Sequence, residues 1–137
     1  MATSLTRVVQ FQAQHQMRVS AWSDARNRET FGALSDLHQH RYRCAVTVRG
    51  PLDPALGMVM DLVLLDRILG EEVLRFEGTN LNQAVPAFAS GAPLPTCEAF
   101  AEFLFQRIDH RLPAGVKLER VRIAEDDALH ADCTGLA

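Results

Sequence analysis

The chain has 137 residues, of which 47% are hydrophobic and 23% are charged, so its size and composition are those of a single globular domain spanning residues 1–137. A formal net charge of -3 gives no electrostatic reason to expect a nucleic acid or an anionic membrane as a partner. The three cysteines show no CxxC spacing, and the chain lacks both a bilayer-spanning apolar run and a hydrophobic signal core, which favours a cytoplasmic protein.

The first half of the chain contains two segments with the alternation of a half-buried strand. In residues 7–17 the odd positions are mostly apolar, whereas the even positions from 10 to 16 are all glutamine. In residues 38–49 the even positions, from His38 to Val48, share one face. Residues 21–31 between them are polar and irregular, and we expect a loop there.

Two helices are expected in the middle of the chain. Asp61 and Thr96 are candidate N-caps because their side-chain oxygens can accept a hydrogen bond from the first turn of a helix. Each precedes an apolar stripe with helical spacing, formed by Leu62, Leu65, Leu69, Val73 and Phe76 in the first case and by Phe100, Phe103, Leu104 and Ile108 in the second. Residues 78–95, rich in Gly, Pro, Asn and Ser, predict a loop between the two helices.

Two further strands are expected near the end of the chain, over residues 117–125 and 129–134, joined by a hairpin at residues 126–128. The predicted order is therefore strand, strand, helix, helix, strand, strand. This order favours an α+β fold in which a four-stranded antiparallel sheet carries both helices on one face.

Three histidines form a candidate metal site. His38 and His40 project from the same face of one strand, and His15 lies on the apolar face of another. Three imidazoles that leave one position open are a common arrangement for catalytic zinc. A pair of histidines two residues apart is also frequent by chance, so the spacing alone leaves a purely structural role open.

The motifs of the chain, taken in order, resemble those of the 6-pyruvoyl-tetrahydropterin synthase and 6-carboxytetrahydropterin synthase family. Residues 11–15 are similar to its FxAxH opening, residues 38–42 to its HGHNY motif, and residues 50–61 to a turn that ends in GMVMD. Residues 80–82 resemble its NLN motif, residues 95–98 resemble PTxE, and Glu125 resembles the glutamate of its closing strand.

This resemblance implies a tunnelling fold that assembles as a homohexamer, a dimer of trimers. It also implies zinc on His15, His38 and His40. A pterin-like ring would be held at subunit interfaces by Glu98 and Glu125 and by the backbone near Thr96 and Cys97, because a carboxylate can accept two hydrogen bonds from an N–C–N edge.

The chain departs from the family pattern at the residues that transfer protons in the family. Leu34 stands at the position of the catalytic cysteine, and Glu77 and Gly78 stand where the family has an Asp-His pair. Neither leucine nor glycine can transfer a proton. Asp36 or Glu77 could act as the base instead, although Asp36 is also a typical turn residue.

Intact metal ligands beside altered proton-transfer residues favour a zinc-dependent lyase or cyclase that acts on a pterin-like or other small aromatic substrate, with a reaction changed from that of the family. The alternatives are a zinc protein that binds a pterin or purine-like ring without turnover, and a hexamer in which zinc is purely structural.

Overall fold

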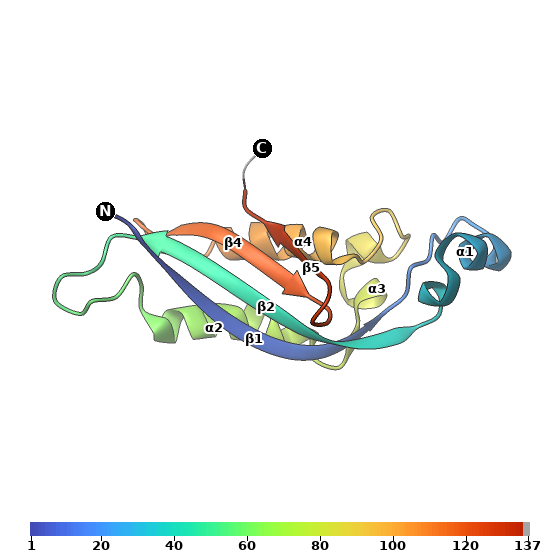
Figure 1. The fold of residues 1–137 in the computed structure, drawn as a ribbon, viewed down its shortest axis with the longest axis horizontal. Coiled ribbons are helices and arrows are strands. Elements are labelled where there is room, and N and C mark those ends of the chain that lie inside the picture. Colours follow the sequence, from blue (N-terminus) through green and yellow to red (C-terminus); the bar gives the residue numbers. More distant parts are fainter. Residues whose placement is uncertain (136–137) are drawn as a thin grey trace.

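The computed structural model describes residues 1–135, which form one curved sheet with helices packed against it (Figure 1). The strands are β1 (Thr3–His15), β2 (His38–Gly50), β3 (Thr79–Asn80), β4 (Lys117–Ala124) and β5 (His130–Cys133). The α-helices are α1 (Asp24–Phe31), α2 (Leu62–Glu72), α3 (Leu81–Ala84) and α4 (Cys97–Asp109). Short 3-10 turns occupy Gly32–Ser35, Leu74–Phe76 and Pro86–Phe88.

The strands β1 and β2 form a long antiparallel pair of 13 residues each. Their register runs from Thr3 opposite Gly50 to His15 opposite His38. The sheet has the order β3-β1-β2-β4-β5, in which β3 runs parallel to β1 and the other neighbours are antiparallel. The end of the long pair that carries the histidines therefore lies at the far end from the chain's N-terminus (Figure 1).

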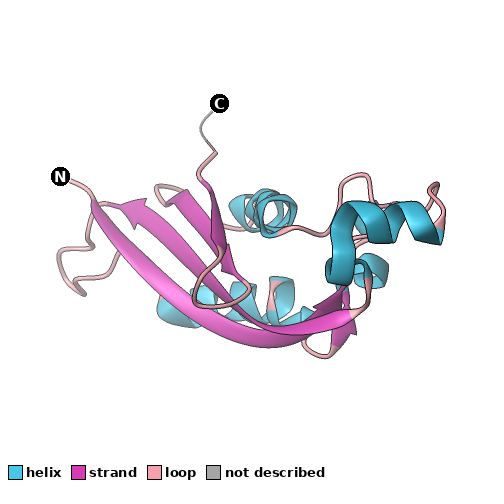
Figure 2. Cartoon of the chain, turned by 45° about the vertical axis from the view of Figure 1, so that its right-hand side comes forward, coloured by secondary structure: helices cyan, strands magenta, loops and turns pink. Residues whose placement is uncertain are grey.

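The long helices α2 and α4 cover one face of the sheet, and Figure 2 shows both on the same side of it. The alternating apolar residues of the strands point toward these helices and join one hydrophobic cluster, as the two sequence patterns predict. Tyr42 and Phe11 are stacked at its centre, with ring centroids 5.2 Å apart, and Phe100 of α4 meets both rings edge-on.

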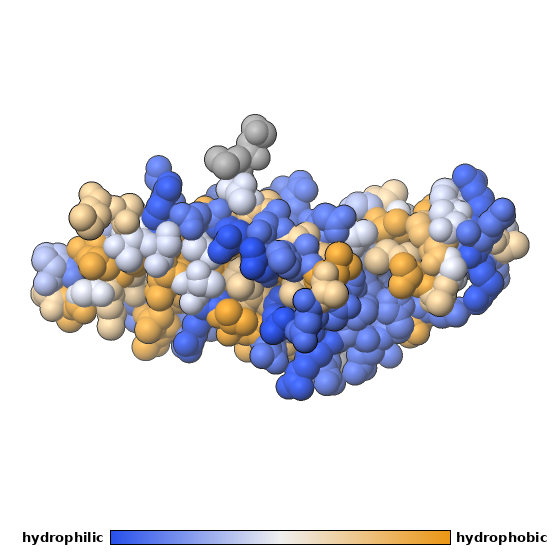
Figure 3. Space-filling view, in the orientation of Figure 1, coloured by the Kyte–Doolittle hydropathy of each residue, from blue (hydrophilic) through white to orange (hydrophobic). Residues whose placement is uncertain are grey.

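The opposite face of the sheet is polar over its middle, where hydrophilic residues gather in Figure 3. The exposed side chains there include Gln10, Gln12, Gln39, Arg41 and Arg43. This face explains the run of glutamines at even positions of β1. No helix within residues 1–135 is long and apolar enough to cross a membrane.

The predicted α+β fold is confirmed, with corrections in its smaller elements. The N-caps Asp61 and Thr96 accept hydrogen bonds from the first turns of α2 and α4 as expected. The sheet has five strands and is mixed, because the two-residue β3 adds a parallel edge to β1. The expected loop at residues 21–31 contains helix α1, whose start is capped by Ser23. The expected loop at residues 78–95 contains β3, α3 and a 3-10 turn.

Candidate metal centre

The candidate metal centre lies where β1 ends and β2 begins. His15, the last residue of β1, pairs with His38, the first residue of β2, and His40 follows two residues later on the same face. One ring nitrogen from each of the three histidines lies within 4.8 Å of the others. The structure thus brings together all three residues that the sequence predicts as metal ligands.

The hydrogen bonds of His15 and His38 involve Nδ1 and leave Nε2 free. His15 Nδ1 lies 2.8 Å from the carbonyl oxygen of Pro95, and His38 Nδ1 lies 2.7 Å from that of Asp36. A carbonyl can only accept, so each Nδ1 carries the proton and each Nε2 keeps its lone pair. The Nε2 atoms of all three histidines are buried and have no hydrogen-bond partner.

These features fit a zinc ion. Buried polar atoms without a partner are rare in native proteins and call for a ligand or another specific explanation. Histidines that bind a metal typically donate their second N–H to a carbonyl or carboxylate, as His15 and His38 do. Three neutral imidazoles suit zinc in particular.

The buried position of His15 keeps its imidazole in the form that binds metal. Its side chain is 1% exposed, and burial lowers its pKa to about 4, an effect that the bond to Pro95 opposes and the neighbouring His38 and His40 reinforce. His15 is therefore neutral at neutral pH, with its Nε2 lone pair available.

Tyr42 contacts His15 from the hydrophobic core, a role that was not predicted from the sequence. Its hydroxyl lies 3.1 Å from His15 Nδ1, and its ring is fully buried against Phe11. Burial, followed by the negative charge of Glu125, raises the pKa of Tyr42 far above its ordinary value, so the hydroxyl stays protonated. The alternation of β2, which places Tyr42 two residues after His40, is the sequence signal that could have indicated this contact.

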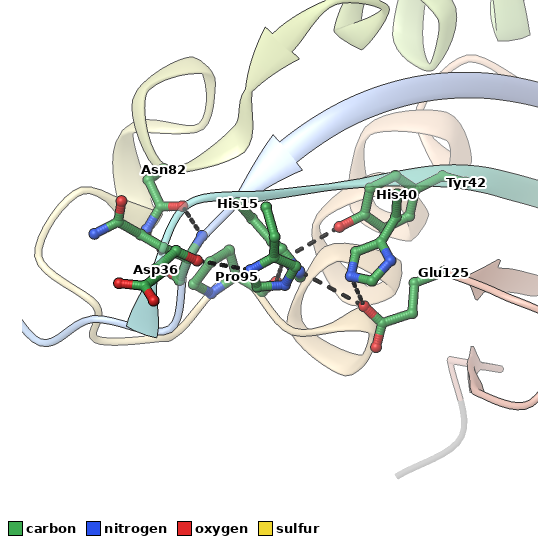
Figure 4. A network of polar contacts seen from close by, with 9 residues as sticks. His15, Asp36, His40, Tyr42, Asn82, Pro95 and Glu125 are labelled. Atoms are coloured by element: carbon green, nitrogen blue, oxygen red, sulfur yellow. Dashed lines mark hydrogen bonds and ion pairs between the residues drawn. The ribbon is translucent and has the colours of Figure 1, made fainter. Parts of the chain in front are cut away.

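The chain just after His15 is held by residues from the second half of the sequence, in helix α3 and in the segment before α4. The Asn82 side chain accepts a hydrogen bond from the Gln16 N–H at 2.9 Å and donates one to the Gln16 carbonyl at 3.0 Å. Pro95, which accepts from His15, directly precedes the N-cap of α4. Figure 4 shows Asn82 and Pro95 on either side of this turn of chain.

Glu125, just beyond β4, extends its carboxylate into the same centre (Figure 4). Its Oε2 lies 2.7 Å from His40 Nε2 and 3.6 Å from His15 Nε2, and its side chain is only 12% exposed. The short contact with His40 does not have the alignment of a hydrogen bond, because His40 Nε2 remains without a partner. Glu125 and His40 line a cavity of about 450 Å³ that also includes Arg43 and Asp127.

The carboxylates of the two candidate bases, Asp36 and Glu77, contact partners other than the three histidines of their own chain. The Asp36 carboxylate is exposed and pairs with Arg28 at 2.6 Å, and Figure 4 shows it turned away from His15 and His40. The Glu77 carboxylate accepts a hydrogen bond from the Gln12 backbone at 2.6 Å and lines a separate cavity of about 390 Å³ that none of the three histidines lines. Within one chain, Asp36 borders the centre through its backbone, whereas Glu77 faces another cavity.

The residues expected to bind a pterin-like ring do not line one common cavity within the chain. Glu98 is exposed and lines a cavity of about 590 Å³ between α4 and β5, apart from the cavity of Glu125. Thr96 caps α4 through its side chain. Cys97 is buried, and burial, followed by the charges of Glu125 and Glu98, raises its pKa to about 12, so its thiol stays protonated.

Comparison with known proteins agrees with this geometry. Residues 4–135 match the family model described as 6-pyruvoyl tetrahydropterin synthase. The chain belongs to the 6-pyruvoyl tetrahydropterin synthase family.

Proteins similar to this chain include enzymes named for more than one activity. A 6-pyruvoyl tetrahydrobiopterin synthase from Poecilia reticulata is 36% identical over 126 residues, covering 90% of this chain and 84% of the relative. A dihydroneopterin monophosphate aldolase from Pyrococcus furiosus is 28% identical over 115 residues, covering 84% of this chain and 82% of the relative. The structure of 6-pyruvoyl tetrahydropterin synthase from Caenorhabditis elegans superposes with a TM-score of 0.87 at 30% identity, covering 99% of this chain and 97% of the other.

Proposed function

We propose that this protein is a zinc-dependent lyase that acts on a pterin-like substrate. The observation that carries the proposal is the set of three buried Nε2 atoms without partners on His15, His38 and His40. Bound there, zinc would supply a Lewis acid for a substrate oxygen. The hydrogen bonds to Pro95 and Asp36 hold the rings of His15 and His38 in place before any ligand arrives.

Asp36 is our candidate for the group that moves a proton. It lies two residues before His38, and its exposed side chain pairs, within the described residues 1–135, with the equally exposed Arg28, a contact that costs little to break. Its backbone carbonyl, by contrast, orients His38. The side chain of Leu34, at the family's cysteine position, offers no such group, and the buried thiols of Cys44 and Cys97 have raised pKa values.

The variant Asp36→Asn separates these two roles. It keeps the carbonyl that orients His38, so zinc content should be unchanged, whereas turnover should fall about 100-fold or more if the carboxylate is the base. Unchanged turnover would remove Asp36 from the proton-transfer step. Arg28→Ala serves as the control, because it releases the Asp36 carboxylate without removing it.

In our proposal, the ring-binding glutamates and the second candidate base, Glu77, reach one site from more than one chain. Glu98, Glu125 and Glu77 line three different cavities of one chain, and the family resemblance implies a hexamer with its sites at subunit interfaces. Mixed hexamers provide the test. If Glu77 acts on the histidines of a neighbouring chain, hexamers mixed from His38→Ala and Glu77→Gln subunits should regain part of the activity that both pure variants lack.

The first experiment on the function combines metal content with turnover. Purified protein is assayed for zinc per chain and incubated with dihydroneopterin triphosphate, and the products are followed by mass spectrometry. If the protein contains zinc and eliminates triphosphate from this substrate, the result supports the reaction that the family resemblance implies. Zinc with cleavage of a carbon–carbon bond in a dihydropterin supports an altered lyase, which the similarity to an aldolase makes worth testing. Protein that binds no zinc would overturn the proposal.

One observation favours a second candidate, a protein whose zinc has only a structural role. Structural zinc sites have four protein ligands, and Glu125 is close enough to the histidines to be a fourth. In that case the purified protein would contain zinc, show no turnover with any dihydropterin, and bind pterins no more tightly than a Glu98→Gln variant does.

A further inference from the structure

The carboxylate of Glu125 pairs with histidines, although its cavity also contains an arginine. Arg43 lines the same cavity, yet it pairs at 2.9 Å with Asp127. Within residues 1–135, the ion-pair partners of the Glu125 carboxylate are instead His40 and His15. The carboxylate therefore faces imidazole nitrogens although an arginine lines the same cavity.

The two distances of this approach bracket the spacing expected between ligands of one ion. Bond lengths of about 2.0–2.2 Å in a tetrahedral arrangement place neighbouring ligand atoms of zinc roughly 3.3 Å apart. Glu125 Oε2 lies 2.7 Å from one Nε2 and 3.6 Å from another, on either side of that value. The shorter contact is close enough for an ion pair but does not form a well-aligned hydrogen bond from His40.

The electrostatics of the cluster also favour a cation. Three buried imidazole nitrogens without hydrogen-bond partners converge with one carboxylate oxygen, and the Nε2 atoms of at least His15 and His38 keep their lone pairs. A mostly buried carboxylate is costly unless a proton or a metal compensates its charge. An ion shared by the four groups would satisfy them together.

We propose that Glu125 is a fourth ligand of the metal when no substrate is bound, and that it leaves the metal when a ring enters. This inference rests on the proposed function, because it needs the metal on His15, His38 and His40 and a ring that engages Glu125. The position that a substrate oxygen needs is then closed in the resting protein and opens only when the ring offers Glu125 another partner. No covalent or redox step is involved, since one oxygen ligand replaces another.

The test uses the cobalt-substituted protein, whose visible spectrum reports on the ligands, and azide as a small anion that competes for the fourth position. Glu125→Gln should bind azide about 10-fold more tightly than the wild type and should hold zinc about 10-fold more weakly in competition with a chelator. Glu125→Asp keeps the charge but shortens the side chain, so it should shift both affinities in the same directions.

Asp127→Asn is the matched control for charge. It removes one carboxylate from the same cavity, but the Asp127 side chain is 96% exposed and pairs with Arg43. Both affinities of this variant should stay within about twofold of wild type, as expected for an exposed charge.

The outcomes separate the inference from the proposed function. If wild type and Glu125→Gln bind azide equally well, the fourth position is already open and the inference is wrong, although the zinc enzyme stands. If Asp127→Asn changes azide affinity as much as Glu125→Gln does, the effect is one of general charge and the inference is also wrong. If the wild type binds neither cobalt nor zinc, the proposed function itself fails.

Discussion

Two of the regions that bury polar groups in this molecule differ in how those groups are hydrogen-bonded. Between α2 and α4, Glu72 is 7% exposed and receives hydrogen bonds from Arg107 at 2.6 Å and from Arg111 at 3.2 Å. At the end of β1 and β2, three buried imidazole nitrogens receive none. The Glu72 cluster is satisfied within the chain, whereas the histidines keep bonding capacity for a ligand.

The largest expected effect comes from removing one of the histidines. His38→Ala removes one of the three histidines proposed to bind zinc, so zinc affinity should fall by more than about 100-fold and any activity should be lost. Zinc per chain, measured after dialysis against a weak chelator, checks this. His130→Ala is the control, because His130 is an exposed histidine at the start of β5. Activity that survives in metal-free His38→Ala would refute the zinc mechanism.

The next largest effect is expected on stability, when Glu72 between α2 and α4 is replaced. Glu72→Gln leaves two arginines without their buried carboxylate and should lower the free energy of unfolding by about 2 kcal/mol at pH 7. Chemical denaturation measures this, and zinc content should not change. Equal stability of the two proteins would mean that Glu72 contributes nothing.

The same substitution has a defined pH dependence. Burial alone would raise the pKa of Glu72, but the hydrogen bonds from Arg107 and Arg111 outweigh it and lower the pKa below its ordinary value of 4.5. The unfolded chain therefore takes up a proton first as the pH falls, and the stabilisation is lost below about pH 4.5. The difference in unfolding free energy between wild type and Glu72→Gln should be constant from pH 7 to 6 and shrink below 4.5.

A smaller effect is expected beneath the metal centre. Tyr42→Phe keeps the ring that stacks on Phe11 and removes the hydroxyl near His15 Nδ1. Because the Pro95 carbonyl still accepts from His15, the loss should be about 1 kcal/mol of stability. Thermal unfolding of the metal-free and zinc-loaded proteins measures it. A complete loss of zinc would show that Tyr42, rather than Pro95, orients His15.

The smallest effect is expected on the polar face of the sheet. Arg122 pairs with Asp132 through two contacts of 2.8 and 3.0 Å, and both side chains are partly exposed. Asp132→Asn should therefore cost less than about 1 kcal/mol, and added salt should reduce the difference. A cost as large as that of Glu72→Gln would contradict the distinction between buried and exposed pairs.

The elements that the sequence predicted well are those with a local signal. The strands β1 and β2 follow from residue alternation, and the starts of α2 and α4 follow from the capping residues Asp61 and Thr96. Helix α1 was missed because its eight residues, DARNRETF, carry no apolar stripe, and only Asn27 among them is buried. The two-residue β3 depends on pairing with β1, which no local pattern indicates.

The metal centre could be predicted only in part for the same reason. The spacing of His38 and His40 is local, but their meeting with His15 depends on the register of β1 and β2. The approach of Glu125 depends in turn on the register of β2 and β4, and the bond to Pro95 joins residues 80 positions apart. Strand register and long-range contacts of this kind are set by tertiary packing, which is not written in local sequence patterns.

The contact between His15 and Pro95 bears on the order of events during folding. Closing a loop of 80 residues is slow compared with forming the β1–β2 pair, because contacts between distant residues must pay their entropy before they stabilise the chain. The hairpin can therefore gather three loosely oriented histidines early, while the orientation of His15 must wait until the second half of the chain has docked. High-affinity zinc uptake should then coincide with the final phase of refolding, so that the ion marks a chain that has completed its fold.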